Sequence, residues 1–227
     1  MNVLGIAYRP DGSVAARFSD TIPLEFQNKK QAEEFSKATL YYEKQFEIAP
    51  GRYDLKVAFR SAGEAFGKLE TPLAIDPYNG KQFALGGVAL SKQLQQASGL
   101  GIDQAMLEDR TPLVSRGIQL IPSGTNRFKK TDPASFYTEI YEPLMVGAEP
   151  PTVALQLRVL DSKTGAEKLD TGFINMASLE QTGNAVIPVG MKVPIMDLAA
   201  GAYRLEMKAM DSAGNVTQVR TVEFELE

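Results

Sequence analysis

The chain has 227 residues, of which 44% are hydrophobic and 23% are charged, and its formal net charge is −4. This length suits two globular domains, each large enough to bury a core, and the slightly acidic balance argues against binding to nucleic acid or to an anionic membrane. The absence of Cys, His and Trp excludes disulfides, thiolate metal sites and the commonest general base. No apolar run approaches the ~18 residues of a membrane span.

The first elements along the chain are predicted to form a β-hairpin. The strand-like runs Val3–Tyr8 and Val14–Phe18 flank Arg9-Pro10-Asp11-Gly12-Ser13, where Pro presets φ and Gly tolerates a positive φ. Residues 29–38 are expected to form a short helix. Alternating apolar residues predict a further strand at 41–48.

A short motif then occurs twice. Residues 49–57 read Ala-Pro-Gly-Arg-Tyr-Asp-Leu-Lys-Val, and residues 199–207 read Ala-Ala-Gly-Ala-Tyr-Arg-Leu-Glu-Met. In both copies apolar residues alternate with polar ones, which predicts a strand with one face on a core and the other in water. The copies lie about 150 residues apart, far beyond a solenoid period, so they indicate two domains.

The tyrosines of this motif, Tyr53 and Tyr203, predict the fold class. In immunoglobulin-like sandwiches, a Tyr near the start of a late strand hydrogen-bonds to nearby backbone and forms a tyrosine corner. We therefore expect an all-β fold of two tandem immunoglobulin-like β-sandwich domains, with Tyr53 and Tyr203 as structural tyrosine corners.

The domain boundary is predicted at the turn-forming sequence Asp76-Pro77-Tyr78-Asn79-Gly80. Domain 1, residues 1–76, offers fewer strand candidates than the ~7 of a usual sandwich, so it is either minimal or truncated. Domain 2, residues 77–227, is expected to carry a long polar loop at 91–112. Its predicted strands span 83–90, 117–121, 136–141, 153–160, 168–174, 185–195, 203–209 and 222–226. Pro188 and Pro194 mark 185–195 as an edge strand or a broken strand.

Two groups of residues are candidates for an interface. Tyr137 and Tyr141 share one face of the strand 136–141, and Tyr is favoured at interfaces because it combines contact area with a polar tip; the alternative is ordinary sheet surface. Arg127 and Phe128 begin the basic cluster 127–130, a combination of charge and aromatic ring that holds single-stranded nucleic acid. The plainer interpretation of that cluster is a solvated loop, which the overall acidity favours.

No catalytic site, metal site or cofactor is predicted. The acidic pairs at 33–34 and 108–109 and the turn residue Asp161 lack the density of oxygen ligands that Ca²⁺ needs. The sequence Asp211-Ser212-Ala213-Gly214-Asn215 is interpreted as a turn. The Gly-x-Ser-x-Gly motif does not occur and no His is available as a base, so we expect the protein not to be an enzyme.

The runs Ala49–Ile75, Leu113–Pro143 and Leu198–Glu227 carry strand and turn signatures that cover much of the chain. They resemble the C-terminal β-sandwich region associated with von Willebrand factor A-related proteins of Acidobacteria. The metal-binding Asp-x-Ser-x-Ser of the von Willebrand domain does not occur here, so its metal chemistry does not carry over. The resemblance implies immunoglobulin-like or fibronectin-like modules on an exported chain, and it transfers no functional residues.

The sequence therefore predicts a non-catalytic structural or protein-interaction module of a larger exported bacterial protein. Its expected partner is another protein or a neighbouring domain of a longer chain, without nucleic acid and without membrane insertion. The alternative is a carbohydrate- or small-ligand-binding module, which would use Tyr41, Tyr78, Tyr137 and Tyr141. No signal peptide is visible, so the chain either stays inside the cell or is a piece of a longer one. We expect the second, with an extracytoplasmic location, periplasmic or secreted.

Overall fold

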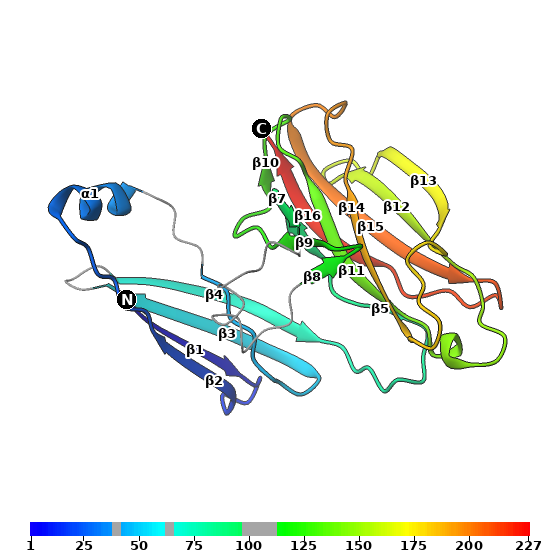
Figure 1. The fold of residues 1–227 in the computed structure, drawn as a ribbon, viewed down its shortest axis with the longest axis horizontal. Helices are drawn as coiled ribbons and strands as arrows, with labels where there is room; N and C mark the ends of the chain where they lie inside the picture. The colour runs from blue at the N-terminus through cyan, green and yellow to red at the C-terminus, as the bar shows by residue number, and fades with distance from the viewer. Residues whose placement is uncertain (38–41, 62–65, 97–112) are drawn as a thin grey trace. The chain divides into compact units, whose positions relative to one another are not determined.

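The computed structural model describes residues 1–37, 42–61, 66–96 and 113–227. The chain divides into two compact units, Met1–Tyr78 and Asn79–Glu227, and the division falls inside the turn sequence 76–80. The described residues are mostly β-strand with one α-helix (Figure 1). The expectation of an all-β protein is confirmed.

Unit 1 is built on one antiparallel sheet with the strand order β2-β1-β3-β4. The predicted hairpin joins the first two strands, and the helix expected at 29–38 is present. The repeated motif opens the third strand, which pairs with the fourth strand along its whole length. The elements are β1 (Asn2–Tyr8), β2 (Val14–Thr21), α1 (Lys29–Lys37), β3 (Gly51–Arg60) and β4 (Phe66–Ile75).

A second sheet is not found among the described residues of unit 1, which differs from the sandwich expected for 1–76. Residues 42–48 alternate between half-buried and exposed as predicted, but they form no strand. Their side chains contact the sheet instead. The Tyr42 hydroxyl donates to Asp20, and the Phe46 ring centroid lies 5.2 Å from that of Phe18. Alternation therefore predicted which side chains face the sheet, whereas the strand predicted for this segment is wrong.

Unit 2 contains most of the strands. The predicted strand at 83–90 is split by residues 86–88, and the long strand expected at 185–195 is shorter and lies at a sheet edge, as its prolines indicated. The elements are β5 (Ala84–Leu85), β6 (Ala89–Ser91), β7 (Gln93–Gln96), β8 (Leu113–Ser115), β9 (Ile118–Ile121), β10 (Arg127–Phe128), β11 (Ser135–Tyr141), the 3-10 helix η3 (Pro143–Val146), β12 (Val153–Asp161), β13 (Glu167–Asn175), β14 (Val186–Lys192), β15 (Gly201–Asp211) and β16 (Arg220–Leu226).

Two sheets of unit 2 enclose one hydrophobic core. One has the order β10-β16-β15-β12-β13, and the other has the order β14-β11-β5, with β6 also paired to β11. Leu157 and Leu205 from the first sheet and Phe136 and Ile187 from the second belong to the same buried cluster. Apolar residues at every second position place one face of each sheet on this core. The arrangement is compatible with a β-sandwich.

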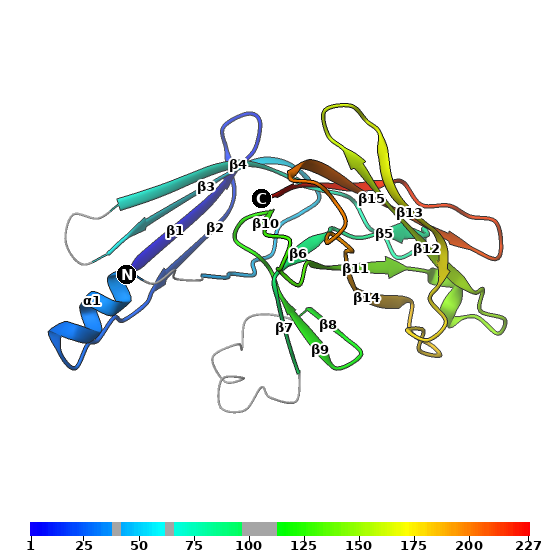
Figure 2. The ribbon, with the colours of Figure 1, turned by 90° about the horizontal axis from the view of Figure 1, so that it is seen from above.

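A small third sheet, β7-β9-β8, lies on the side of β11 away from that core (Figure 2). The Ser115 hydroxyl at the end of β8 donates to the carbonyl of Pro188 in β14 at 2.7 Å. This layer was not predicted. Residues Gln93–Gln96 pair with β9, so this part of the segment 91–112, which was expected to be a loop, is a strand. The rest of that loop, 97–112, lies outside the described residues.

Candidate functional site

Strand β11 is covered on both of its faces. Phe136 and Ile140 point into the core and are fully buried, while Tyr137, on the opposite face, is only 6% exposed. Because side chains alternate across a strand, the burial of Tyr137 requires a layer on the outer face, and the third sheet supplies it. The outer face of β11 is therefore enclosed by unit 2 itself at Tyr137.

The two candidate interface tyrosines share one acceptor. The Tyr137 hydroxyl donates to Oε1 of Glu139 at 3.0 Å, and the Tyr141 hydroxyl donates to Oε2 of the same residue at 2.6 Å. Burial, reinforced by the Glu139 carboxylate, raises the pKa of Tyr137 above its ordinary value. Both phenols are thus held as hydrogen-bond donors to an internal carboxylate.

A pocket of about 210 Å³ opens beside this cluster, between the third sheet and the outer face of β11 and β14. Its apolar wall includes Leu94, Leu120, Tyr137 and Met191. These residues come from four different strands, two in each layer. The pocket is therefore a product of the packing between layers.

Two cationic residues, Arg116 and Lys192, also line the pocket, and no carboxylate is among its described lining residues. Arg116 lies in the turn between β8 and β9. Its φ is 52°, a backbone conformation that is uncommon for residues other than Gly. Its guanidinium donates to the Ser178 hydroxyl. Lys192 is the last residue of β14. Sequence reasoning missed both residues, although Arg116-Gly117 is a turn signal that marks an exposed loop tip.

A second unusual group is a pair of buried carboxyls at the ends of two strands. Glu142 follows β11 and is 1% exposed, and Asp211 ends β15 and is 3% exposed. Oε1 of Glu142 accepts a hydrogen bond from the Leu144 amide at 2.9 Å. The other oxygen, Oε2, receives none from any donor of the described chain.

The Asp211 carboxyl lies close enough to Glu142 for each group to influence the ionisation of the other. Two acceptors can share a hydrogen bond only if one of them carries a proton. Burial, together with the neighbouring Asp211, raises the pKa of Glu142. Burial also opposes ionisation of Asp211, but hydrogen bonds from the side chain and backbone of Asn215 outweigh it and hold the pKa of Asp211 low. Of the two carboxyls, Glu142 therefore holds a proton more readily than Asp211 does.

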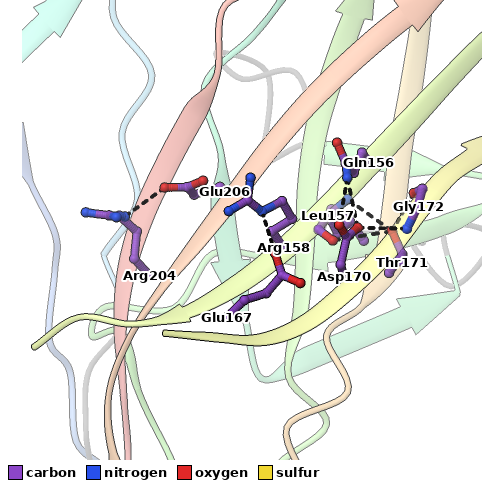
Figure 3. A network of polar contacts seen from close by, with 9 residues as sticks. All are labelled: Gln156, Leu157, Arg158, Glu167, Asp170, Thr171, Gly172, Arg204 and Glu206. Carbon is purple, nitrogen blue, oxygen red and sulfur yellow. Dashed lines mark hydrogen bonds and ion pairs between the residues drawn. The ribbon is translucent and has the colours of Figure 1, made fainter. Parts of the chain in front are cut away.

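The outer face of β12, β13 and β15 carries a network of polar contacts (Figure 3). Nε2 of Gln156 donates to Oδ1 of Asp170 at 2.8 Å, and Nε of Arg158 lies 3.1 Å from Oε2 of Glu167. Hydrogen bonds from Gln156 and from the Gly172 amide lower the pKa of Asp170. The side chains of Arg158 and Glu167 are paired with each other and are partly exposed to water.

Residues of this network also compensate for an irregularity in the pairing of the sheet. The pairing register of β12 with β13 shifts between Gln156 and Arg158, which leaves backbone groups without a ladder partner. The amide of Leu157 donates to Oγ1 of Thr171 at 3.1 Å instead. Side chains of β13 therefore complete the sheet here, which explains their positions without a ligand.

The residues predicted as tyrosine corners have matching geometry in both units. The Tyr53 hydroxyl donates to the carbonyl of Ala49 at 2.7 Å, and the Tyr203 hydroxyl donates to the carbonyl of Ala199 at 2.8 Å. Both rings are buried. Each hydroxyl thus closes the chain onto the residue four positions earlier.

The Arg127–Phe128 pair does not form a surface cluster, which corrects the interface expectation for Phe128. Its ring is 2% exposed and lies 6.2 Å from the Phe224 ring in the core. Arg127 is exposed, and its Nε lies 2.9 Å from Oε2 of Glu225. A hollow of about 280 Å³ beside it is also lined by Glu223 and Glu225, so the local charge is mixed.

Some predicted positions lie outside the described residues, namely Tyr41 and the acidic pair 108–109. Within residues 1–37, 42–61, 66–96 and 113–227, no three acidic side chains come together in a way that could hold a metal ion. Tyr78 is 42% exposed and lies at the end of unit 1.

Comparison of the sequence with protein-family models and with curated proteins found no match. Among the helices of the described chain, none has the length and apolar character that crossing a bilayer requires.

Proposed function

We propose that the chain is a non-catalytic interaction module built from tandem immunoglobulin-like domains of a larger exported bacterial protein, and that it binds a protein partner through the sheet of unit 1. The matching hydrogen bonds of Tyr53 and Tyr203 support the immunoglobulin-like assignment, because this corner is typical of such sandwiches. The location outside the cytoplasm follows from the sequence resemblance.

The observation that carries the proposal is the edge strand β4. Its ten residues pair with β3 in continuous register, and β3 is its only strand partner among the described residues. An unpaired strand edge presents backbone donors and acceptors that a strand from another protein can bind. Pro72 has no amide hydrogen, so we expect this pairing to involve residues 66–71.

Exposed apolar side chains lie along the same edge. Phe66 is 65% exposed and Leu69 is 55% exposed, while Phe59 on the neighbouring strand is 45% exposed. In a strand added to β4, alternate side chains would contact these residues on either face of the sheet. Backbone pairing would supply affinity and the apolar contacts would supply specificity.

The test is site-specific photo-crosslinking in the cell that makes the protein. A photoreactive phenylalanine analogue replaces Phe66 in one variant and Lys163, in the β12–β13 hairpin, in a control. We expect one discrete adduct with a second protein from position 66 and none from position 163. The same adduct from both positions, or none from position 66, would contradict the proposal.

Once that partner is purified, Leu69→Lys provides the second test. The added positive charge at the edge is expected to weaken binding about tenfold or more, because strand addition buries this position. Hydrogen exchange of the β4 amides is the accompanying measurement. If binding leaves their exchange unchanged, the partner binds elsewhere.

A further inference from the structure

The pocket beside Tyr137 combines an apolar wall with positive charge. We propose that it binds a small carboxylate with an apolar body, of the size of a short-chain fatty acid, with the carboxylate held by Arg116 and Lys192. This inference concerns unit 2 and does not depend on the interaction proposed for the sheet of unit 1.

The charge of the ligand follows from the donors that the pocket offers. The hydroxyls of Ser115 and Ser135, two further lining residues, donate to the carbonyls of Pro188 and Pro133. A guanidinium has five N–H donors, of which the bond from Arg116 to Ser178 uses one.

Lys192 adds three further donors. Among the described residues, neither cation has a carboxylate within ion-pair distance. Glu139, the acid nearest in sequence to Tyr137, accepts from two tyrosine hydroxyls. Among the side chains of the described lining residues, the donors that remain are therefore cationic, and an anion complements them.

The apolar part of the ligand follows from the wall and the volume. The interior of the pocket is lined by the hydrocarbon side chains of Leu94, Ile118, Leu120 and Met191. At roughly 30 Å³ for each water-sized group, a pocket of about 210 Å³ holds about seven non-hydrogen atoms. A short aliphatic tail fits this space, whereas a sugar would bury hydroxyls against a wall without partners for them. The structure therefore favours a fatty carboxylate over the carbohydrate alternative considered from the sequence.

The experiment is an NMR titration of the ¹⁵N-labelled full chain with hexanoate, with 1-hexanol as the uncharged match. We expect hexanoate to shift the amide signals of Leu94, Arg116, Ile118, Gly190 and Lys192 in a saturable way. Hexanol should bind at least about tenfold more weakly, since it lacks the charge-assisted hydrogen bonds. Equal binding of the two compounds, shifts centred elsewhere, or no shift at millimolar hexanoate would each overturn the proposal.

Single substitutions test whether the two cations, rather than other charges on the surface, bind the carboxylate. Arg116→Gln and Lys192→Gln are each expected to weaken hexanoate binding about tenfold, while Lys192→Arg retains it. The matched control is Lys168→Gln on β13, which is outside the lining and should bind as the unchanged chain does. If both Gln variants bind hexanoate with unchanged affinity, the pocket does not recognise the carboxylate. Crosslinking from position 66 is unaffected by either result, so the two proposals fail separately.

Discussion

The same strand motif leads to different burial in the two units. Tyr53 and Tyr203 are 7% and 4% exposed and make equivalent hydrogen bonds. Along the strands, the two copies then diverge. Leu205 is 1% exposed, whereas Leu55 is only half-buried. Two residues beyond the motif, Ala209 in unit 2 is fully buried and Phe59 in unit 1 is 45% exposed.

The difference lies in what covers the inner face of each sheet. In unit 2, β11 and β14 oppose β15 across the core, and their side chains fill the space between the sheets. In unit 1, an extended segment, residues 42–50, contacts β2 and β3 through single side chains. A small unit buries a smaller fraction of its surface. The comparison teaches that a local motif sets the orientation of side chains, while the opposing layer sets how much they contribute to stability.

The largest expected effect concerns the leucines of the motif. Leu205→Ala should destabilise unit 2 by about 3 kcal/mol, because it leaves a cavity in a packed core. Leu55→Ala should destabilise unit 1 by only about 1 kcal/mol, since a half-exposed side chain loses less transfer energy. Urea unfolding followed by NMR signals of each unit measures both values. Equal losses would show that the two cores are equally packed.

The next largest effect on stability is expected at the pair of buried carboxyls, Glu142 and Asp211, which lies in unit 2. Glu142→Gln should raise the free energy of unfolding at pH 7 to 8 by about 1 to 3 kcal/mol. The amide keeps a donor for Asp211 and an acceptor for Leu144 without a charge to bury. The matched control is Glu180→Gln, since Glu180 also accepts a backbone hydrogen bond, from Val153 at 3.1 Å; it should produce no such gain.

The pH dependence of this effect has a definite sign. The pKa of Glu142 is raised above its ordinary 4.5, so its contribution is complete below pH 4.5 and is lost as the pH rises through the folded pKa. The pKa of Asp211 is lowered below its ordinary 3.8, so its contribution is present above pH 3.8 and is lost as the pH falls through the folded pKa. The advantage of Glu142→Gln should therefore shrink toward pH 4. A loss of stability in this variant at neutral pH would show that Glu142 is ionised.

The tyrosine corners are expected to give a smaller and matched effect. Tyr53→Phe and Tyr203→Phe each remove one hydroxyl and leave one backbone carbonyl without its partner. Each should cost about 1 kcal/mol, with similar values in the two units despite their different cores. Thermal unfolding of the two variants is the measurement. A loss confined to Tyr203→Phe would mean that the corner depends on the surrounding core.

The smallest effect is expected at the exposed edge of unit 1. Phe66→Ser should change stability by less than about 0.5 kcal/mol, because the side chain is 65% exposed. The same change should lower affinity for the partner identified by crosslinking. Comparing unfolding and binding for this one variant separates interaction from folding. A large loss of stability would assign Phe66 to the fold of unit 1 instead.

Much of the local structure could be predicted from the sequence. Turn residues located the hairpin at 9–13, and alternation identified the inward faces of β3 and β15. The pocket and the acid pair could not be predicted. Arg116 and Lys192 come from strands or turns more than seventy residues apart, and Glu142 and Asp211 come from different sheets. Such pairs depend on which sheets face each other, which periodicity does not encode.

By itself, the sequence determined the β-class, the orientation of alternating side chains and the exclusion of cysteine and histidine chemistry. These properties depend on residue types and on neighbours along the chain. The tertiary structure alone decided that residues 42–48 contact a sheet without joining it, that a third sheet covers Tyr137, and that two carboxyls share a buried space. The physical reason is that strand pairing and burial are set by contacts between distant segments, and the same alternating pattern is compatible with several such contacts.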